Sequence, residues 1–363
     1  MYSAVALARE QISLNTALPE AQVFIGGPPC QGFSSAGMRR AGDARNTLVS
    51  VYAKLVAKYR PTAFVFENVE GFLTGEEGAR VIDLLEPLVD AGYRIHLRKV
   101  NAANYGVAQH RKRVVAVGGL GWDPTFPEPT HAARGAPGAH LVGRHLGTTP
   151  TLLQALDGLP APDARAPGFP PGHFVGRLDD KDLERLTALA PGQTMRDLPE
   201  HLWHETFARR ANRRVQDGTP TEQRGGAPSG IRRLRGDEPS KAITSMTRSE
   251  FVHPIENRYL TLRECARIQG FSDDFVFAGP QVDQATVIGN AVPPRFSLAI
   301  ATQLRAELAG HAGRDNRPGK LLSFVPTASS GMSPALARIT AEVRNRFMAS
   351  GVTHDTEQLP LWG

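Results

Sequence analysis

Cys30 stands in a setting that suits a nucleophile presented to a ligand. It follows Gly26-Gly27-Pro28-Pro29, in which the glycines allow close backbone approach and the prolines hold the chain extended. A cysteine thiol is a nucleophile when its pKa is lowered or when a base lies nearby. A lone free cysteine is more often a small buried side chain, but the rigid proline pair favours a reactive one here.

Glu67 is the candidate acid beside this thiol. The apolar runs at residues 22–27 and 63–66 are typical of short buried strands, and Glu67 follows the second run directly. Neighbouring strand ends in a parallel sheet lie about 5 Å apart, so Glu67 and Cys30 can face one pocket. Burial would raise the pKa of a carboxyl group there and let it donate a proton. The alternative is a surface glutamate that caps the next helix.

A polar fork precedes a later strand. Residues 109–113 read QHRKR, and alternation along an extended chain puts Gln109, Arg111 and Arg113 on one side. Guanidinium groups placed in this way can hold a planar polar ligand beside a pocket. Much later in the chain, residues 289–294 (GNAVPP) predict a tight turn that presents backbone polar groups before a helix.

The elements that must position these side chains alternate along the chain. Strands are predicted at residues 22–27, 94–100 and 113–118 and around 63–66, with helices at 46–59 and 78–91. Such alternation predicts an α/β fold with a parallel sheet covered by helices, in which ligands bind at the carboxyl ends of the strands. Further helices are predicted at 261–269, 294–308 and 333–348, and a loop over 309–332.

Composition excludes several classes of protein. With 363 residues, 41% of them hydrophobic and 21% charged, the chain can bury a core. It has neither an apolar run of membrane-spanning length nor a signal peptide, so a soluble cytoplasmic protein is predicted. Cys30 and Cys265 are too few for a disulfide framework, and Cys265 is expected to be buried in a helix. The histidines lack metal-ligand spacing, so no metal is expected.

The positive charge is concentrated in one segment. The chain carries a net charge of +6, and residues 205–235 hold eight arginines against three acidic residues, a net of +5. A run of charge is usually a solvated surface. A polyanionic partner is the alternative that this concentration permits.

Six blocks of the sequence resemble, in order, the cytosine-C5 methyltransferase family, which acts mainly on DNA. They are residues 26–34 (GGPPCQGFS), 43–48 (DARNTL), 67–72 (ENVEGF), 101–113 (NAANYGVAQHRKR), 260–271 (LTLRECARIQGF) and 289–294 (GNAVPP). The ordered set covers roughly residues 22–118 and 239–305. The insert between the fourth and fifth blocks corresponds in position to the family's target-recognition region.

The resemblance implies a reaction and a site. Cys30 would attack C6 of a cytosine flipped out of duplex DNA, Glu67 would bind N3, and Arg111 and Arg113 would hold the base and steady both groups. C5 would then accept the methyl group of S-adenosylmethionine. The implied cofactor contacts are Pro29, Leu48 and Asn290. The implied nucleic-acid contacts are Ser34, Arg45, Gln109, Arg209, Arg210, Arg213, Arg214, Arg232, Arg233 and Arg235.

The resemblance also implies a Rossmann-like methyltransferase sheet with a smaller, irregular target-recognition domain. We expect the catalytic domain at residues 1–125, the recognition region at 126–240, a return to the catalytic domain at 241–310 and a tail with one helix at 311–363. The family's glycine-rich cofactor loop is not visible in residues 1–21, so the sheet is expected to be incomplete there and the strand at 22–26 to be an open edge. An upstream start codon, a second chain that supplies the missing half, or a decayed gene would each explain this.

Other functions stay open at this point. A tRNA methyltransferase carries similar motifs, although the long arginine-rich insert favours duplex DNA. A DNA-binding relic without methyl transfer is the non-enzymatic alternative. The segment from Gln358 to Trp362 (QLPLW) resembles a short motif that docks on the replication sliding clamp, which would be a further partner; the alternative is a chain end folded back on its own domain.

Overall fold

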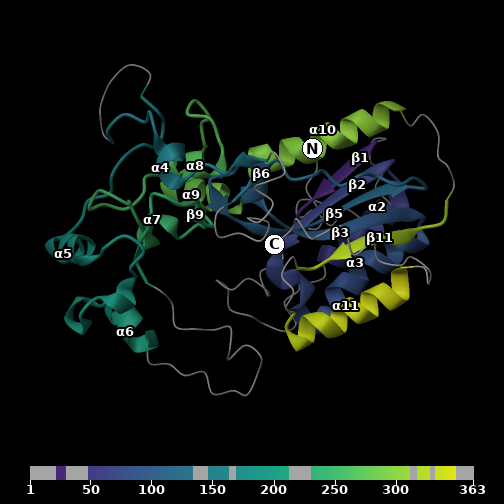
Figure 1. Ribbon diagram of the computed structural model, residues 1–363, viewed down its shortest axis with the longest axis horizontal. Coiled ribbons are helices and arrows are strands. Elements are labelled where there is room, and N and C mark those ends of the chain that lie inside the picture. The colour runs from purple at the N-terminus through teal and green to yellow at the C-terminus, as the bar shows by residue number, and fades with distance from the viewer. Residues whose placement is uncertain are drawn as a thin grey trace.

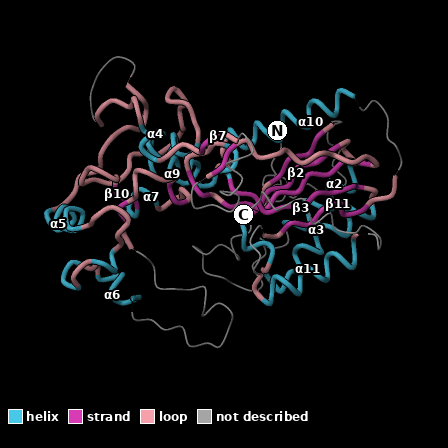
Figure 2. Tube along the Cα trace, in the orientation of Figure 1, coloured by secondary structure: helices cyan, strands magenta, loops and turns pink. Residues whose placement is uncertain are grey.

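The protein is described by a computed structural model. It covers residues 22–29, 48–133, 146–162, 169–211, 230–310, 317–327 and 332–348. Two lobes are visible in Figure 1, one built on a central sheet and one containing the short helices α4 to α9. Figure 2 shows that strands dominate the first lobe and loops the second.

The central sheet contains five strands in the order β1-β2-β5-β3-β11. Their bounds are Val23–Gly26 (β1), Ala63–Val69 (β2), Lys112–Leu120 (β5), Tyr93–Asn101 (β3) and Lys320–Val325 (β11). β1 pairs in parallel with β2, and β11 pairs in parallel with β3. β5 runs antiparallel to both of its neighbours. β1, β2, β3 and β5 confirm the four predicted strands, with boundaries shifted by a few residues.

The prediction of a parallel sheet was wrong for β5. The chain between β3 and β5 holds only a short 3₁₀ helix, Ala102–Tyr105, and the two-residue strand β4, Gln109–His110. A parallel connection needs a crossover of a dozen or more residues, usually a helix. With so short a link, β5 has to return antiparallel to β3, and the sheet is mixed.

Helices cover both faces of this sheet (Figure 1). On one face, Phe64 and Phe66 of β2 pack with buried side chains of α2 (Leu48–Tyr59), α3 (Ala79–Asp90) and α11 (Pro334–Phe347). On the other face, Ala63 and Val65 of β2 pack with α10 (Pro294–Gly310). These four helices confirm the predicted ones at 46–59, 78–91, 294–308 and 333–348. Each buries an apolar stripe against the sheet.

β11 lies in a segment that we expected to be a loop. Its pairing with β3 shifts register between Leu321 and Ser323, so its buried residues Leu321 and Phe324 are three positions apart instead of two. A bulge of this kind removes the alternation by which strands are recognised in sequence. His96 of β3 also holds Ser323, with 2.7 Å between Nδ1 and Oγ.

The second lobe is made of small elements. Its helices are α4 (Leu152–Leu156), α5 (Asp180–Ala188), α6 (Glu205–Ala211), α7 (Thr247–Glu250), α8 (Leu262–Gln269) and α9 (Gln281–Asn290). The two-stranded pairs are β4 with β9 (Ser240–Lys241), β6 (His131–Ala132) with β7 (Gly147–Thr148), and β8 (Arg232–Arg233) with β10 (Phe251–Val252). The 3₁₀ turns Met195–Asp197 and Glu200–Leu202 belong to this lobe, whereas Glu70–Leu73 and Gly75–Gly78 lie between β2 and α3 in the sheet lobe. α8 confirms the helix predicted at 261–269, and Cys265 is buried within it.

β1 stands at one end of the sheet as described, next to β2 alone. Ile25, in the middle of this strand, is 63% exposed. Whether another strand pairs with β1 on its other side stays a prediction, because residues 1–21 lie outside the described residues. None of the helices in the described ranges is long and apolar enough to cross a bilayer.

Leu321→Ala tests the contribution of β11. Leu321 is 1% exposed, and a buried leucine truncated to alanine costs about 2–5 kcal/mol through lost burial and the cavity left behind. We expect a loss of this size in the free energy of unfolding measured by urea denaturation. Leu298→Ala on α10 is the matched control because Leu298 is 65% exposed. Equal stabilities for the two variants would contradict the packing of β11 on the core.

Candidate active site

Glu67 and Arg113 form an ion pair at one end of the central sheet. The distance from Arg113 Nε to Glu67 Oε1 is 2.8 Å, and about a fifth of the Glu67 side chain (20%) is exposed. In the β2–β5 register Glu67 is opposite Val115, so Arg113 is its diagonal neighbour on the same face. The two side chains therefore meet because of strand pairing.

The surroundings of Glu67 shift the pKa of its carboxyl group upward. Burial raises the pKa of the Glu67 carboxyl group, and the positive charges of Arg113 and Arg111 pull it back only in part. Burial in turn lowers the pKa of Arg113, while Glu67 raises it. A carboxyl group with a raised pKa takes up a proton more readily, and in its protonated form it can donate a hydrogen bond to a ring nitrogen.

The end of β1 reaches Glu67. A Cβ atom added to Gly27 would lie 3.2 Å from Glu67 Oε2, so a side chain there would crowd the carboxyl group. Asn68 Nδ2 also donates to the carbonyl oxygen of Pro28 at 3.2 Å. Cys30 follows two residues after Pro28 in the chain. Cys30, Ser34 and Arg45 themselves lie outside the described residues.

Gln109 and Arg111 are turned toward the protein and not toward a surface. Gln109 is fully buried, and its amide binds Gln269, the carbonyl oxygen of Ile268 and the amide N–H of Ile243. The two terminal nitrogens of Arg111 donate to backbone carbonyl oxygens, and its Nε is buried without an acceptor in the described part of the chain. The expected nucleic-acid contact of Gln109 therefore has no exposed group to make it.

The three expected cofactor residues keep accessible surface. Pro29 and Leu48 are half-buried, and Asn290 is exposed. Two half-buried apolar residues and one exposed asparagine match in kind the adenosine and amino-acid parts of S-adenosylmethionine. The predicted turn at 289–294 differs in detail, because Gly289 and Asn290 form the last residues of α9 and residues 291–293 link it to α10.

The arginine-rich segment divides into buried and accessible side chains. Arg233 is buried, and its guanidinium group donates to the carbonyl oxygens of Leu189, Leu186, His253 and Glu256 and to the side chain of Asn257. This placement leaves Arg233 no group for DNA, and its role is structural. The backbones of Arg209 and Arg210 lie in α6, whereas Arg213 and Arg214 lie outside the described residues.

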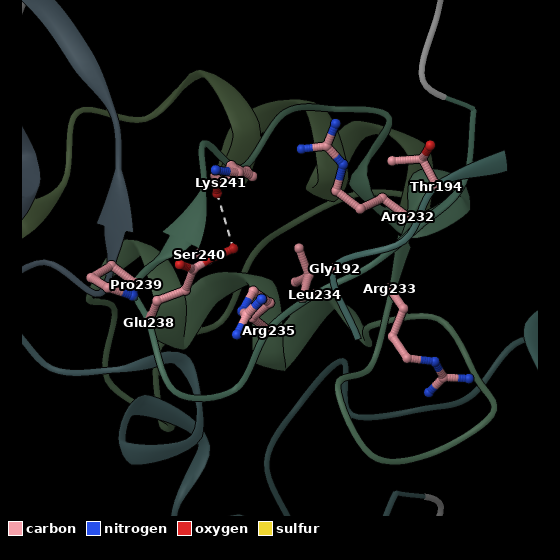
Figure 3. A pocket seen from close by; sticks show the side chains of 10 residues that line it. All are labelled: Gly192, Thr194, Arg232, Arg233, Leu234, Arg235, Glu238, Pro239, Ser240 and Lys241. Carbon is pink, nitrogen blue, oxygen red and sulfur yellow. Dashed lines mark hydrogen bonds between the residues drawn. The ribbon is translucent and has the colours of Figure 1, made fainter. Parts of the chain in front are cut away.

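Arg232 and Arg235 line a cavity of about 270 Å³ together with Lys241. Figure 3 shows the Arg233 side chain pointing away from that of Arg232, as expected for neighbours on a strand. The cavity is not purely basic, because Glu238 also lines it and Asp237 lies 3.5 Å from Arg235. Within the described ranges, no group of three or more His, Cys, Asp or Glu side chains could hold a metal ion.

Two residues of this region were missed from the sequence. Asn68 is buried and ties the end of β2 to the end of β1. Gln269 is fully buried and links Gln109 to the carbonyl oxygen of Ile288 at the end of α9. Both residues lie within the blocks at 67–72 and 260–271 that carry the family resemblance, which is the sequence signal that could have indicated them.

Comparison with known proteins identifies the family. The sequence matches the model of the C-5 cytosine-specific DNA methylases over residues 7–133 and 184–306. The Type II methyltransferase M1.HphI of Haemophilus parahaemolyticus is 34% identical over 77% of this chain and 67% of its own length. M.AgeI of Thalassovita gelatinovora, also a Type II methyltransferase, is 30% identical over 82% of this chain and 85% of its own.

One solved structure supports the fold. It is described as a DNA modification methyltransferase encoded within an Escherichia coli prophage, and it covers 85% of this chain and 84% of its own with a TM-score of 0.56 at 22% identity. At this identity the likeness concerns the fold alone. The family match, the two relatives and the Glu67–Arg113 geometry agree, and the chain belongs to the C-5 cytosine-specific DNA methylase family.

Proposed function

We propose that this protein methylates C5 of cytosine in duplex DNA and that Cys30, Glu67 and Arg113 carry the chemistry. The observation that supports this most directly is the half-buried Glu67–Arg113 pair near the end of β2, beside Gly27, which directly follows β1. Because the two relatives are Type II methyltransferases, restriction–modification is the setting that we propose. The bacterial cytoplasm, in association with the nucleoid, is then the proposed location.

In the proposed reaction the Cys30 thiolate forms a bond to C6 of a flipped cytosine. The electron pair of the C5–C6 double bond then makes C5 nucleophilic, and the protonated Glu67 carboxyl group donates a hydrogen bond to N3 as charge develops there. When bound, S-adenosylmethionine supplies the methyl group that C5 accepts. A base removes the C5 proton, the sulfur–C6 bond breaks, and the ring double bond re-forms.

We propose that contacts to the DNA backbone offset the free-energy cost of flipping the base out of the duplex. Extrusion of a base costs a few kcal/mol, and phosphate contacts from basic side chains can offset it. Arg232, Arg235 and Lys241 line the cavity in the second lobe. Ser34, Arg45, Arg209, Arg210, Arg213 and Arg214 remain proposed contacts on the strength of the family resemblance.

The cofactor and partner assignments follow the same resemblance. The family uses S-adenosylmethionine as its methyl donor, and we assign Pro29, Leu48 and Asn290 to its site because they are the matching residues with accessible surface. A second chain that completes the cofactor side and a sliding clamp bound through residues 358–362 remain predictions. The latter segment lies outside the described residues.

Cys30→Ser tests the covalent step. A duplex with 5-fluorocytosine at the target position should trap the wild-type protein in the presence of cofactor, because fluorine cannot leave as a proton does. We expect the Cys30→Ser variant to form no adduct on a denaturing gel. Cys265→Ser is the matched control and should still form it, since Cys265 is buried in α8. Duplex binding without an adduct in the wild-type protein would favour the DNA-binding relic, and an adduct on tRNA alone would favour the tRNA enzyme.

Arg113→Gln tests the state of Glu67. If the protonated carboxyl group is the active form, kcat/KM should fall as the pH rises through the raised pKa of Glu67. The positive charge of Arg113 lowers the pKa of Glu67. Its removal should therefore raise that pKa and move the falling limb of the pH profile to higher pH. Arg317→Gln, which removes an arginine paired with Asp123, should leave the limb in place. A shift to lower pH in Arg113→Gln would refute this role of the pair.

Arg235→Gln tests the proposed DNA contact. A single phosphate contact contributes about 0.9 to the slope of log K against log salt concentration, so the variant should bind duplex DNA more weakly and with a slope smaller by about that amount. Arg346→Gln on α11 is the control, because this arginine is exposed and pairs with Glu86. Fluorescence anisotropy over a salt series measures both. An unchanged slope in Arg235→Gln would remove Arg235 from the interface.

A further inference from the structure

Arg111 connects two segments that are far apart in the sequence. Its Nη1 donates to the carbonyl oxygen of Ile243 at 2.8 Å, and its Nη2 donates to that of Gly289 at 2.7 Å. The side chain is 1% exposed, so both bonds are shielded from water. Charge-assisted hydrogen bonds in such a setting are the stronger kind.

Ile243 is held at both of its backbone groups. Gln109 Oε1 accepts from the Ile243 N–H at 3.0 Å, while Arg111 binds the Ile243 carbonyl oxygen. The two side chains leave the same short segment, two residues apart, before β5. They fix one peptide segment of the second lobe against the sheet.

The end of α9 is held in the same way. Gln269, which binds Gln109, donates to the carbonyl oxygen of Ile288 at 2.5 Å. Gly289 packs so closely on this region that an added Cβ atom would lie 2.4 Å from the backbone nitrogen of Ser245. The position therefore requires glycine, and α9 sits directly on the segment that contains Ile243.

We propose that Arg111 is a positioning residue that sets the cofactor side of the site against the base side. It acts through the backbone of Gly289 on the next residue, Asn290, and it sits two residues before Arg113, the partner of Glu67. This inference rests on the proposed function, because Asn290 is assigned to the cofactor there. Arg111 then serves methyl transfer without touching the base.

The geometry argues against a grip on the base by the outer nitrogens of Arg111. Both Nη groups are already bound to protein backbone, and their release would leave two buried carbonyl oxygens without partners, at a cost that buried polar groups impose. Arg113 differs, since it contacts the Glu67 carboxyl group itself. The two arginines of the fork therefore have separate tasks.

Arg111→Lys separates this role from a merely structural one. A lysine can make at most one of the two bonds with comparable geometry, so we expect affinity for S-adenosylhomocysteine, measured by calorimetry, to fall about tenfold, as loss of one charge-assisted hydrogen bond implies. Amide hydrogen exchange should become faster at residues 288–291. The pH limb assigned to Glu67 should stay where it is in the wild-type protein.

Arg263→Lys is the matched control. Arg263 is also 1% exposed and donates to three backbone carbonyl oxygens, those of Pro171, Ser272 and Phe275. Its replacement should lower the melting temperature and leave the affinity of the folded protein for S-adenosylhomocysteine unchanged. Equal losses of affinity in the two lysine variants would reduce Arg111 to a general structural residue and overturn the proposal.

A measurement on the wild-type protein covers the case in which Arg111→Lys does not fold. Binding of S-adenosylhomocysteine should slow amide exchange at Ile243 together with residues 288–291, because Gln109 and Arg111 tie the two segments. Protection of 288–291 without Ile243 would overturn the proposal. If the wild-type protein does not bind S-adenosylhomocysteine at all, the cofactor assignment fails and not the link. Weaker binding of DNA by Arg111→Lys at unchanged cofactor affinity would instead assign Arg111 to the base.

Discussion

The ion pair between Glu67 and Arg113 exists because β5 runs antiparallel to β2. Glu67 lies near the carboxyl end of its strand and Arg113 near the amino end of its own. If β5 ran parallel to β2, these two strand ends would lie at opposite ends of the strands in the sheet. Because β5 runs in the opposite direction, the segment before it, with Gln109 and Arg111, lies at the same end of the sheet as the last residue of β1. One change of strand direction thus gathers the polar groups of the site.

Buried arginines hold this protein together through backbone carbonyl oxygens. Arg111, Arg233 and Arg263 are each buried and each donate to carbonyl groups of segments that lack regular pairing. In a lobe of short helices and two-stranded pairs, many carbonyl groups have no partner in secondary structure, and burial without one is costly. A guanidinium group with five donors can satisfy several at once. Some of the arginines in this lobe therefore serve to satisfy buried backbone carbonyl groups of irregular segments.

The sequence predicted the parts of the fold that have strong periodicity or ordered motifs. The helices α2, α3 and α11 were predicted from apolar spacing, α8 and α10 were also predicted, and Glu67 and Arg113 stand in the ordered blocks. β11 escaped because its bulge breaks the alternation of Leu321 and Phe324. The direction of β5 could have been inferred from the short link after β3. Which arginines are buried could not, since Arg232 and Arg233 are chemically alike and differ only in the face of β8 that they occupy.

The pairing of β3 with β11 has a consequence for biosynthesis. His96 and Ser323 are 227 positions apart in the chain. During translation, the side of β3 that pairs with β11 therefore stays an unpaired strand edge until β11 leaves the ribosome. Unpaired borders of this kind invite association with other chains. The speed of translation through the second lobe then sets how long that border stays open.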